Sequence, residues 1–440
     1  MDNIYIKRKI DSDLDTWANS WIRMPLLLRG ARQVGKTTSV RNFSQNFDNF
    51  VEINFEKNKK AHKVFEGDLI PSEICRNLSY LVGKPIVAGK TLLFFDEIQA
   101  CKPAIEALRF FCEDLPELHV IAAGSLFEFA LEEITSFGVG RIHSLYMYPF
   151  SFSEFLEGFN ETMLVDLIEN SNETNPISEA VHQKLLNYLK IFLIIGGMPK
   201  VVATYQQTNN LLECSNILSQ LINALKSDFA KYRKKMPDMR LTNILNSVAN
   251  QMGNKFVYAH AEGNFDYKQI KECLEMLRMA GLVFPVVHTS ANGLPLGAEI
   301  NEKHMKYLFF DTGLYQNLLG LDLSDLLLSD DFSVINKGNI AELYVGLELV
   351  KASKKTLLPQ LYNWVREAKN SNAEIDYLIQ NDNKIIPIEV KSGTKGSMQS
   401  MYLFINEKQM GYGIRTSLEN FGQHEQIKTV PLYAIGNVLE

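Results

Sequence analysis

The chain has 440 residues and a formal net charge of −6, with 46% hydrophobic and 22% charged residues. That length is too great for one hydrophobic core and predicts several domains. The negative balance excludes a protein coated in positive charge, so any contact with nucleic acid has to be local. No apolar run reaches the length of a membrane span, and the N-terminus lacks the apolar core of a secretory signal, so we expect a cytoplasmic protein. The five cysteines show no CxxC spacing, which is typical of reduced thiols and argues against zinc.

The first strong signal is a glycine-rich turn between an apolar run and a helical stretch. Residues 26–28 are leucines that predict a buried strand, and the turn follows them directly. Glycines let backbone N–H groups surround an anion, the helix N-terminus adds positive potential, and a lysine reaches the terminal phosphates. A threonine hydroxyl after the lysine is a ligand for Mg²⁺. We therefore expect a P-loop that binds ATP with Mg²⁺ through Gly30, Ala31, Arg32, Gln33, Val34, Gly35, Lys36, Thr37 and Thr38.

A second apolar run supplies the residues that hydrolysis needs. Residues 92–95 are all apolar, as expected for a strand that is covered on both faces of a parallel sheet. At the end of this strand Asp96 would hold Mg²⁺, and Glu97 would activate the attacking water as a general base. An acidic strand end is common by itself, but its position about 60 residues after a P-loop favours the catalytic interpretation.

Two further residues are candidates whose alternatives stay open. Ser125 ends the next predicted strand, where it would sense the γ-phosphate, or would simply form a Gly-Ser turn. Arg141 begins a fifth strand. It would be an arginine finger, acting in its own chain or in a neighbouring subunit of a homo-oligomer, or else an ordinary surface arginine. Arg32 is expected to pair locally rather than to catalyse.

These motifs resemble a family of prokaryotic AAA-superfamily ATPases whose C-terminal half is a domain of unknown function. The resemblance covers nearly the whole chain and is carried, in that family's order, by LLLRGARQVGKTT, FFDEIQ, AAGS, YPFSFSEFL, IGGMPKVV, FFDTGL, GNIAELYV and IEVKSG. It implies an α/β protein that begins with a P-loop parallel-sheet ATPase core. We place an AAA-type ATPase core in residues 1–158, a helical lid in 159–240, a winged-helix-like module in 241–330 and a PD-(D/E)XK nuclease-like domain in 331–440.

The middle of the chain has helical periodicity. Apolar residues recur at three- and four-residue spacing from Ile177 until two glycines at 196–197 end the helix. We interpret these helices as a lid that transmits hydrolysis as movement. Residues 267–279 predict the last helix of a winged helix, but their mixture of acidic and basic side chains favours a structural or protein-contact role over DNA binding. The basic stretch 231–240 is either a solvated helix face or a contact with a nucleic-acid backbone.

The C-terminal region combines a helix with a strand hairpin. The helix carries Glu342 and is predicted to be amphipathic, and an Asn-Asp-Asn turn joins the two strands that follow. Asp376 lies in the first strand, and Glu389 and Lys391 share one face of the second. The three carboxylates would hold Mg²⁺ for a nuclease, with Lys391 steadying the attacking water. A surface ion pair is the alternative, but the D…(D/E)-x-K pattern, which the resemblance also implies, favours the nuclease-like fold.

Two functions are compatible with these observations. In the first, ATP hydrolysis is coupled to engagement and cleavage of nucleic acid, DNA rather than RNA, by the nuclease-like domain. In the second, ATP controls a regulatory switch that binds a protein partner, and the nuclease-like domain is catalytically silent. The modest content of basic residues keeps the second function open, whereas Glu97 and the long C-terminal half disfavour a small-molecule kinase.

Overall fold

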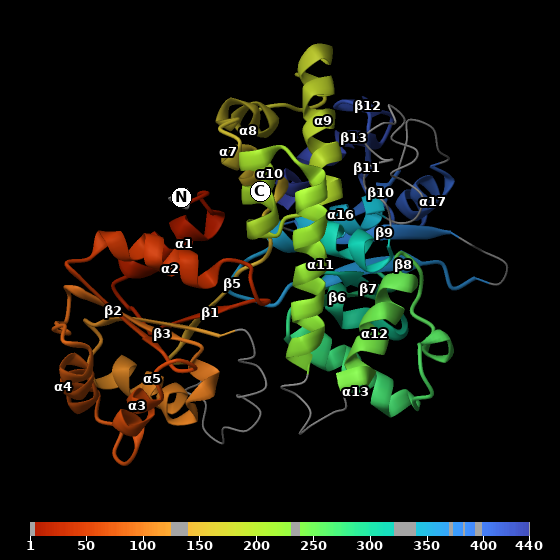
Figure 1. The fold of residues 1–440 in the computed structure, drawn as a ribbon. Helices are drawn as coiled ribbons and strands as arrows, with labels where there is room; N and C mark the ends of the chain where they lie inside the picture. Colours follow the sequence, from red (N-terminus) through yellow and green to blue (C-terminus); the bar gives the residue numbers. More distant parts are fainter. Residues whose placement is uncertain are drawn as a thin grey trace. The chain divides into compact units, whose positions relative to one another are not determined.

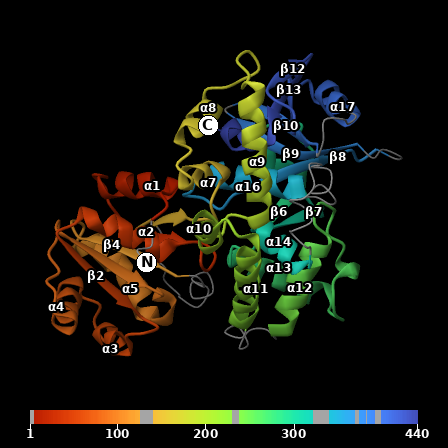
Figure 2. The same cartoon turned by 45° about the horizontal axis from the view of Figure 1, so that its top comes forward.

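A computed structural model describes residues 5–124, 140–229, 238–320, 340–368, 373–381, 383–391 and 398–439. The chain divides into two compact units, which Figures 1 and 2 show as ribbons. Residues 1–148 and 354–358 form the first unit, and residues 149–353 and 359–440 form the second. Ser125 and most of the basic stretch 231–240 lie outside the described residues. None of the helices in the described ranges is long and apolar enough to cross a membrane.

The first unit is built on a parallel five-stranded sheet in the order β2-β3-β4-β1-β5. Helices α1 and α2 lie over one face, and α3, α4 and α5 lie over the other (Figures 1 and 2). The elements are α1 (Lys9–Ala18), β1 (Leu26–Arg29), α2 (Lys36–Phe43), β2 (Asn49–Asn54), α3 (Lys59–His62), α4 (Pro71–Val82), β3 (Thr91–Asp96), α5 (Lys102–Asp114), β4 (His119–Ala123) and β5 (His143–Tyr146).

The two apolar runs of the sequence form β1 and β3, the strands on either side of the central strand β4. Every residue of β3 is buried, and the three leucines of β1 are fully buried. Helices on both faces explain why these strands are apolar throughout rather than alternating. Leu27 and Phe95 share one core with the apolar faces of α4 and α5. The strands predicted at residues 26–28 and 92–95 are confirmed.

The second unit begins with helices and continues into a larger sheet. Its helices are α7 (Phe152–Gly158), α8 (Thr162–Glu169), α9 (Glu179–Ile195), α10 (Pro199–Thr208), α11 (Leu211–Asp228), α12 (Asp238–Asn250), α13 (Tyr267–Met279), α14 (Thr312–Leu318), α16 (Ile340–Ala352) and α17 (Gln399–Lys408), with a 3₁₀ segment at Leu432–Leu439. The helix predicted to end at the glycine pair is α9, which stops at Gly196 in a left-handed conformation with φ of 73°. The helix predicted at residues 267–279 is α13.

The sheet of the second unit has eight strands in the order β12-β13-β11-β10-β9-β8-β6-β7. Its strands are β6 (Val283–Thr289), β7 (Ile300–Phe309), β8 (Leu361–Val365), β9 (Glu374–Asn381), β10 (Lys384–Val390), β11 (Gly413–Ser417), β12 (Gly422–His424) and β13 (Ile427–Pro431). Strand β6 pairs in parallel with β8, so one sheet continues across the boundary placed at residue 330. Strands β6 and β7, which lie in the region assigned to a winged-helix-like module, therefore form one end of this sheet.

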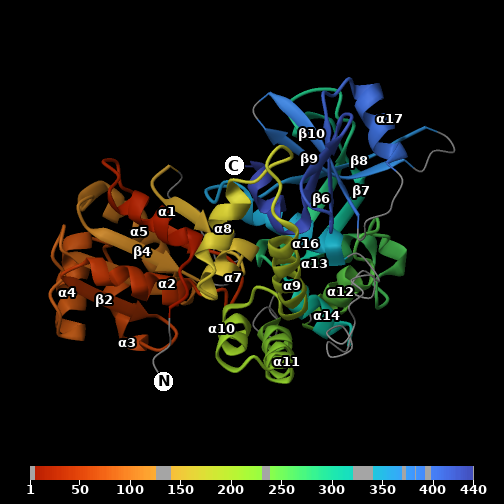
Figure 3. The same cartoon turned by 90° about the horizontal axis from the view of Figure 1, so that it is seen from above.

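Helix α16 was expected to be amphipathic, and this expectation is wrong. Every residue from Ile340 to Val350 except Glu342 is buried. The helix lies on one face of the sheet and α17 lies on the other (Figure 3). Gly346 allows this close approach, because a Cβ there would lie 2.5 Å from the hydroxyl of Tyr377 on β9. The 3₁₀ segment at the C-terminus also packs against α16 and covers more of its surface.

Two of the signature segments meet in a buried turn of the second unit. Asp311 is 2% exposed and accepts hydrogen bonds from the backbone N–H groups of Gly197 (2.7 Å) and Leu314 (2.9 Å). A Cβ at Gly196 would clash with the Asp311 carboxylate, so only glycine fits beside it. Burial raises the pKa of Asp311, and the backbone donors oppose this effect. The segments IGGMP and FFDTGL are therefore joined through one side chain.

A buried ion pair joins two more of these segments. Glu348 and Lys351 of α16 lie 2.9 Å apart with side chains that are 5% and 8% exposed. Glu348 accepts from the N–H of Phe152 at 3.1 Å, and Lys351 donates to the carbonyl of Phe150 at 2.9 Å. The YPFSFSEFL segment is thereby attached to α16. These signatures act as structural contacts inside the second unit.

Candidate nucleotide site and C-terminal carboxylate cluster

The glycine-rich turn of the first unit has a backbone that requires its glycines. Gly30 has φ of +134°, and a Cβ there would overlap the carbonyl oxygen of Met147. Gly35 has φ of 101° and is the N-cap of α2. Residues other than glycine rarely adopt such φ angles, so the glycines of the sequence determine the conformation of this loop locally. The N-terminus of α2 follows directly, which is the arrangement that binds phosphate groups.

Lys36 lies folded over this loop. Lys36 is 8% exposed, and its Nζ donates to the carbonyls of Gly30 and Ala31, each at 2.8 Å. Burial lowers the pKa of Lys36 to about 8, although the charges of Glu97 and Asp96 raise it in opposition. The amino group is thus held at the loop by neutral carbonyl oxygens, which an anionic ligand can replace.

Thr37 and Asp96 are brought together as the sequence predicts. Thr37 Oγ1 lies 3.1 Å from Asp96 Oδ1, although the two residues come from α2 and β3. Asn54 at the end of β2 donates to Asp96 Oδ2 at 2.8 Å. A hydroxyl and a carboxylate side by side at a phosphate-binding loop are oxygen ligands that fit Mg²⁺. Asn54 was missed, and its signal was its place at the end of the strand beside β3.

Glu97 follows Asp96 in a left-handed conformation with φ of 50°. This backbone is uncommon for a residue other than glycine, and such conformations gather at functional sites. Gln99 donates to Glu97 Oε2 at 2.6 Å and fixes the direction of its carboxylate. Gln99 had no role in the sequence interpretation. The geometry therefore adds a positioning residue to the expected base.

Arg8 is a further residue that sequence reasoning missed. It is 5% exposed and donates to the carbonyls of Val34 at 2.9 Å and Tyr148 at 2.7 Å. Val34 belongs to the P-loop, so Arg8 holds the loop to a segment more than a hundred residues away in sequence. Nearby, the Tyr5 hydroxyl donates to Asp11 at 2.7 Å, and its oxygen lies 3.0 Å from Ser39 Oγ of α2. Through these hydrogen bonds the N-terminal segment contacts both the P-loop and α2.

Arg141 does not meet the P-loop of its own chain. It precedes β5, whose first residue His143 pairs with Leu26 at the beginning of β1, whereas the P-loop follows the end of β1. Because a strand rises about 3.3 Å per residue, this places Arg141 on the order of 15 Å from the loop. Its guanidinium forms an ion pair with Glu113 at the end of α5. A role as a finger within the same chain does not fit this position.

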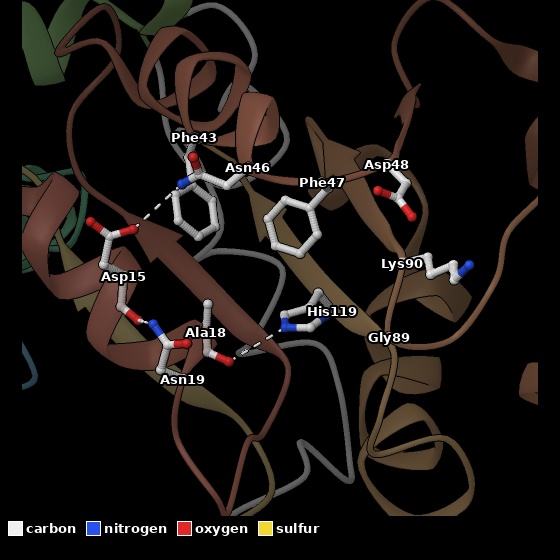
Figure 4. Close-up of a pocket in the computed structure, with 10 residues that line it drawn as sticks. All are labelled: Asp15, Ala18, Asn19, Phe43, Asn46, Phe47, Asp48, Gly89, Lys90 and His119. Carbon is white, nitrogen blue, oxygen red and sulfur yellow. Dashed lines mark hydrogen bonds between the residues drawn. The ribbon is translucent and has the colours of Figure 1, made fainter.

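A cavity of about 380 Å³ opens at the amino ends of β2, β3 and β4, away from the P-loop. Figure 4 shows its lining residues Asp15, Ala18, Asn19, Phe43, Asn46, Phe47, Asp48, Gly89, Lys90 and His119. The ring of His119 packs edge-on against Phe47 and Trp17, with centroids 4.8 and 5.9 Å apart. Burial and the charge of Arg23 lower the pKa of His119 to about 4. This cavity is separate from the nucleotide site.

The second unit gathers the carboxylates predicted for a nuclease. The antiparallel hairpin register pairs Ile388 with Tyr377, and these residues adjoin Glu389 and Asp376 in their strands. Asp376 Oδ2 accepts from the N–H of Val390 at 2.8 Å, and Lys391 Nζ lies 2.7 Å from Glu389 Oε1. Glu389 is 7% exposed, and among the described residues its buried Oε2 has no hydrogen-bond partner. The predicted pair of strands is confirmed, and these side chains meet at its end.

Lys306 and Glu374 join this group without having been predicted. Lys306 of β7 is 4% exposed, and its Nζ lies 3.0 Å from Glu342 Oε1 and 2.5 Å from Glu374 Oε1. Burial would lower the pKa of Lys306, but the charges of Glu342, Glu374 and Asp376 raise it above its usual value. The lysine therefore stays charged among the carboxylates.

Burial shapes the electrostatics of the carboxylates as well. It raises the pKa of Glu342 to about 8, with Lys306 opposing the shift. It raises the pKa of Glu389 to about 7, and the charge of Asp376 adds to this effect. The pKa of Asp376 is raised too, mainly by burial. Across the described ranges, no group of three or more His, Cys, Asp or Glu side chains is arranged to hold a metal ion.

Three protein-family models match the chain. Residues 23–156 match the model of an AAA domain, residues 186–325 match a domain of unknown function (DUF8612), and residues 337–435 match another domain of unknown function (DUF4143). The part of the chain that contains the P-loop is therefore similar to AAA domains. Neither of the other two descriptions mentions a winged helix or a nuclease. No curated protein matches the chain.

Several solved structures are similar over most of the chain at low identity. A Walker-type ATPase of Pyrococcus abyssi is 15% identical, with 72% of this chain and 96% of that chain covered and a TM-score of 0.45. The ORC1 protein of Aeropyrum pernix in complex with DNA is 13% identical, with 76% and 96% covered and a TM-score of 0.28. A signal transduction ATPase with numerous domains from Pyrococcus horikoshii is 10% identical, with 79% and 46% covered and a TM-score of 0.27. Since all three TM-scores lie below 0.5, no functional conclusion rests on these likenesses.

Proposed function

We propose that the protein binds and hydrolyses ATP with Mg²⁺ at the P-loop of the first unit. The observation that carries this proposal is the meeting of Lys36, Thr37 and Asp96 at the N-terminus of α2. Lys36 exchanges its carbonyl partners for the terminal phosphates, and Thr37 and Asp96 hold Mg²⁺, which neutralises phosphate charge when bound. Glu97, oriented by Gln99, accepts a proton from the attacking water.

A steady-state ATPase assay tests this proposal on the full chain. Lys36→Ala is expected to reduce hydrolysis by about 100-fold or more, because a cationic phosphate contact is lost. Glu97→Gln is expected to reduce hydrolysis by about 100-fold or more and to leave ATP binding close to wild type. Lys90→Ala, at an exposed lysine on the opposite end of the sheet, is the matched control. Hydrolysis at the wild-type rate in Glu97→Gln would remove Glu97 from the reaction.

The two remaining sequence candidates belong to the same proposal. Ser125, which lies outside the described residues, is proposed to sense the γ-phosphate. Arg141 is proposed to act on the nucleotide of a neighbouring subunit in a homo-oligomer; its place before β5, whose first residue pairs with the beginning of β1, supports this proposal. Mixing Arg141→Ala with Glu97→Gln chains is then expected to restore hydrolysis that neither variant supports alone. Arg76→Ala, at an exposed arginine of α4, is the control, and mixtures as inactive as their components contradict the role.

We further propose, from the sequence pattern, that ATP turnover controls engagement of nucleic acid, DNA rather than RNA, by the second unit. Cleavage is a separate property, because it needs a metal ion at Glu342, Asp376 and Glu389 as well as a bound strand. The test is whether double-stranded DNA, single-stranded DNA or RNA stimulates ATP hydrolysis, with Lys36→Ala as the background. Hydrolysis indifferent to every nucleic acid counts against engagement and leaves the ATPase intact.

A protein partner is the alternative, and one observation favours it for α13. The cations of this helix are paired with carboxylates: Arg278 with Glu275 at 2.6 Å, Lys271 with Glu302 at 3.3 Å, and Lys268 with Glu272 at 4.0 Å. A helix that binds DNA presents its cations to phosphate groups, and counterion release makes such binding sensitive to salt. Hydrolysis that DNA does not stimulate even at low salt would therefore favour the protein-binding switch.

A further inference from the structure

The cluster of the second unit contains a cation of its own. Lys306 reaches it from β7, which is separated in the sheet from β9 by β6 and β8. Its Nζ lies within 3.0 Å of an oxygen of Glu342 and of Glu374, and its side chain is 5% exposed. A lysine is almost never buried to this extent unless it is paired, so its place among the carboxylates is specific.

Two further carboxylate oxygens of the cluster also have partners. Lys391 takes Glu389 Oε1, and the N–H of Val390 takes Asp376 Oδ2. Mg²⁺ demands near-octahedral oxygen ligands at about 2.0–2.1 Å. A divalent ion placed between Glu342 and Asp376 would have to displace the Lys306 ammonium or lie close to it, where two cations repel in a poorly hydrated space. The residues present therefore do not fit the metal that the nuclease pattern implies.

We propose that the ammonium of Lys306 takes the place of a metal ion in this cluster, so that its charge offsets part of the negative charge of Glu342, Glu374 and Asp376 and the cluster binds no divalent cation. The cluster then fastens α16, β7 and β9 to one another. The second unit engages its partner without metal-dependent cleavage. That consequence rests on the proposed engagement, whereas the statement about the cluster stands without it.

Titration of nucleotide-free protein with Mn²⁺, followed by the electron paramagnetic resonance signal of the free ion, tests the proposal directly. Wild type and Asp376→Asn are expected to give the same binding curve, because the cluster takes no ion and the P-loop is the same in both. Lys306→Met keeps the shape of the side chain and removes its charge. It is expected to gain a Mn²⁺ site that the wild type lacks and that the added Asp376→Asn substitution removes.

Lys303→Met is the matched control, since Lys303 lies on the same strand and is exposed. It is expected to behave as wild type. Mn²⁺ binding by the wild type that Asp376→Asn abolishes would overturn the proposal, and so would a folded Lys306→Met protein with no added site. If Lys306→Met does not fold, the comparison of wild type with Asp376→Asn decides alone.

Plasmid cleavage and ATP hydrolysis on the same proteins separate the two proposals. The wild type is expected to leave supercoiled DNA intact with Mg²⁺ or Mn²⁺ at the level of Lys391→Ala. Cleavage above that level contradicts the proposal that the cluster binds no divalent cation. Loss of DNA-stimulated hydrolysis together with unchanged Mn²⁺ curves contradicts only the engagement.

Discussion

The P-loop and the C-terminal cluster both bring a lysine to acidic side chains, but they treat the charges in opposite ways. At the P-loop, Lys36 is held by backbone carbonyls, and Asp96 is held by the neutral groups of Thr37 and Asn54. In the cluster, Lys306 and Lys391 bind the carboxylates directly. A site whose charged groups have neutral partners leaves those charges available to a ligand, whereas an ion pair compensates them within the protein. The difference separates a binding site from a structural contact.

The largest effect is expected at Asp96, the carboxylate that is proposed to hold Mg²⁺. Asp96→Asn preserves the shape of the side chain and its hydrogen bond to Thr37 but removes the negative charge. ATP hydrolysis is expected to fall by ~10³-fold. Asp376→Asn, the same change in the cluster, is expected to leave hydrolysis unchanged. Equal losses in both variants would show that the two sites are not independent.

The next effect concerns stability. Lys306→Met leaves Glu342 and Glu374 without their cation, and breaking a largely buried ion pair costs about 3–5 kcal/mol. The free energy of unfolding of the second unit is expected to fall by about 3 kcal/mol, measured by urea denaturation with the fluorescence of Trp364. Lys303→Met is expected to change it by less than about 0.5 kcal/mol.

A double substitution sharpens this result. Adding Glu342→Gln to Lys306→Met removes the charge that has lost its partner, so part of the stability is expected to return. A double variant as unstable as the sum of its single substitutions would mean that the pair contributes no coupling energy. The cluster would then be a coincidence of packing.

A smaller effect is expected at the neutral partner of Asp96. Asn54→Ala removes the hydrogen bond that orients Oδ2, and the loss of such a support to a metal ligand costs about 10–100-fold in affinity or activity. The concentration of Mg²⁺ that half-saturates ATP hydrolysis is expected to rise by about tenfold. Asn58→Ala, at the partly exposed N-cap of α3, serves as the control. An unchanged Mg²⁺ dependence would make Asn54 a purely structural residue.

How much the sequence predicted depends on whether a contact is local. Lys36 and Thr37 were predictable because one short segment contains the loop and the helix that hold them. Asn54 and Arg8 were not, since each reaches its partner only after β2 or the N-terminal segment has packed. The contacts of Asn54 and Arg8 depend on where these residues lie in the folded protein, and no local sequence motif indicates them.

The second unit shows the same limit more strongly. Lys306 lies in a strand that had been assigned to a different module, and a lysine in a strand is ordinarily read as exposed. Helix α16 was expected to be amphipathic, with Glu342 on one side. Its other charged pair, Glu348 and Lys351, is buried because the two side chains form an ion pair with each other. A pattern of hydrophobicity records the polarity of each side chain but not the partner that it finds.

The smallest effect concerns a group that belongs to neither site. His119 has a pKa of about 4, lowered from its ordinary value by burial beside Trp17 and Phe47 and by the charge of Arg23. Between pH 6.5 and 4 the unfolded chain binds the proton more tightly than the folded chain does. The stability due to neutral His119 is therefore fully present above pH 6.5 and is lost as the pH falls towards 4. Allowing for the partial exposure of the ring, the free energy of unfolding is expected to fall by about 1 kcal/mol over this range.

His119→Gln is expected to remove this part of the pH dependence, measured by urea denaturation at several pH values with the fluorescence of Trp17 and Trp21. His424→Gln, at an exposed histidine, is expected to keep it. A His119→Gln protein whose stability still falls as steeply as that of wild type would place the titrating group elsewhere. Because His119 lies at the amino ends of the strands, away from the P-loop, ATP binding at pH 7 is expected to stay unchanged in this variant. That outcome would separate the two ends of the sheet, one that binds nucleotide and one that holds the fold.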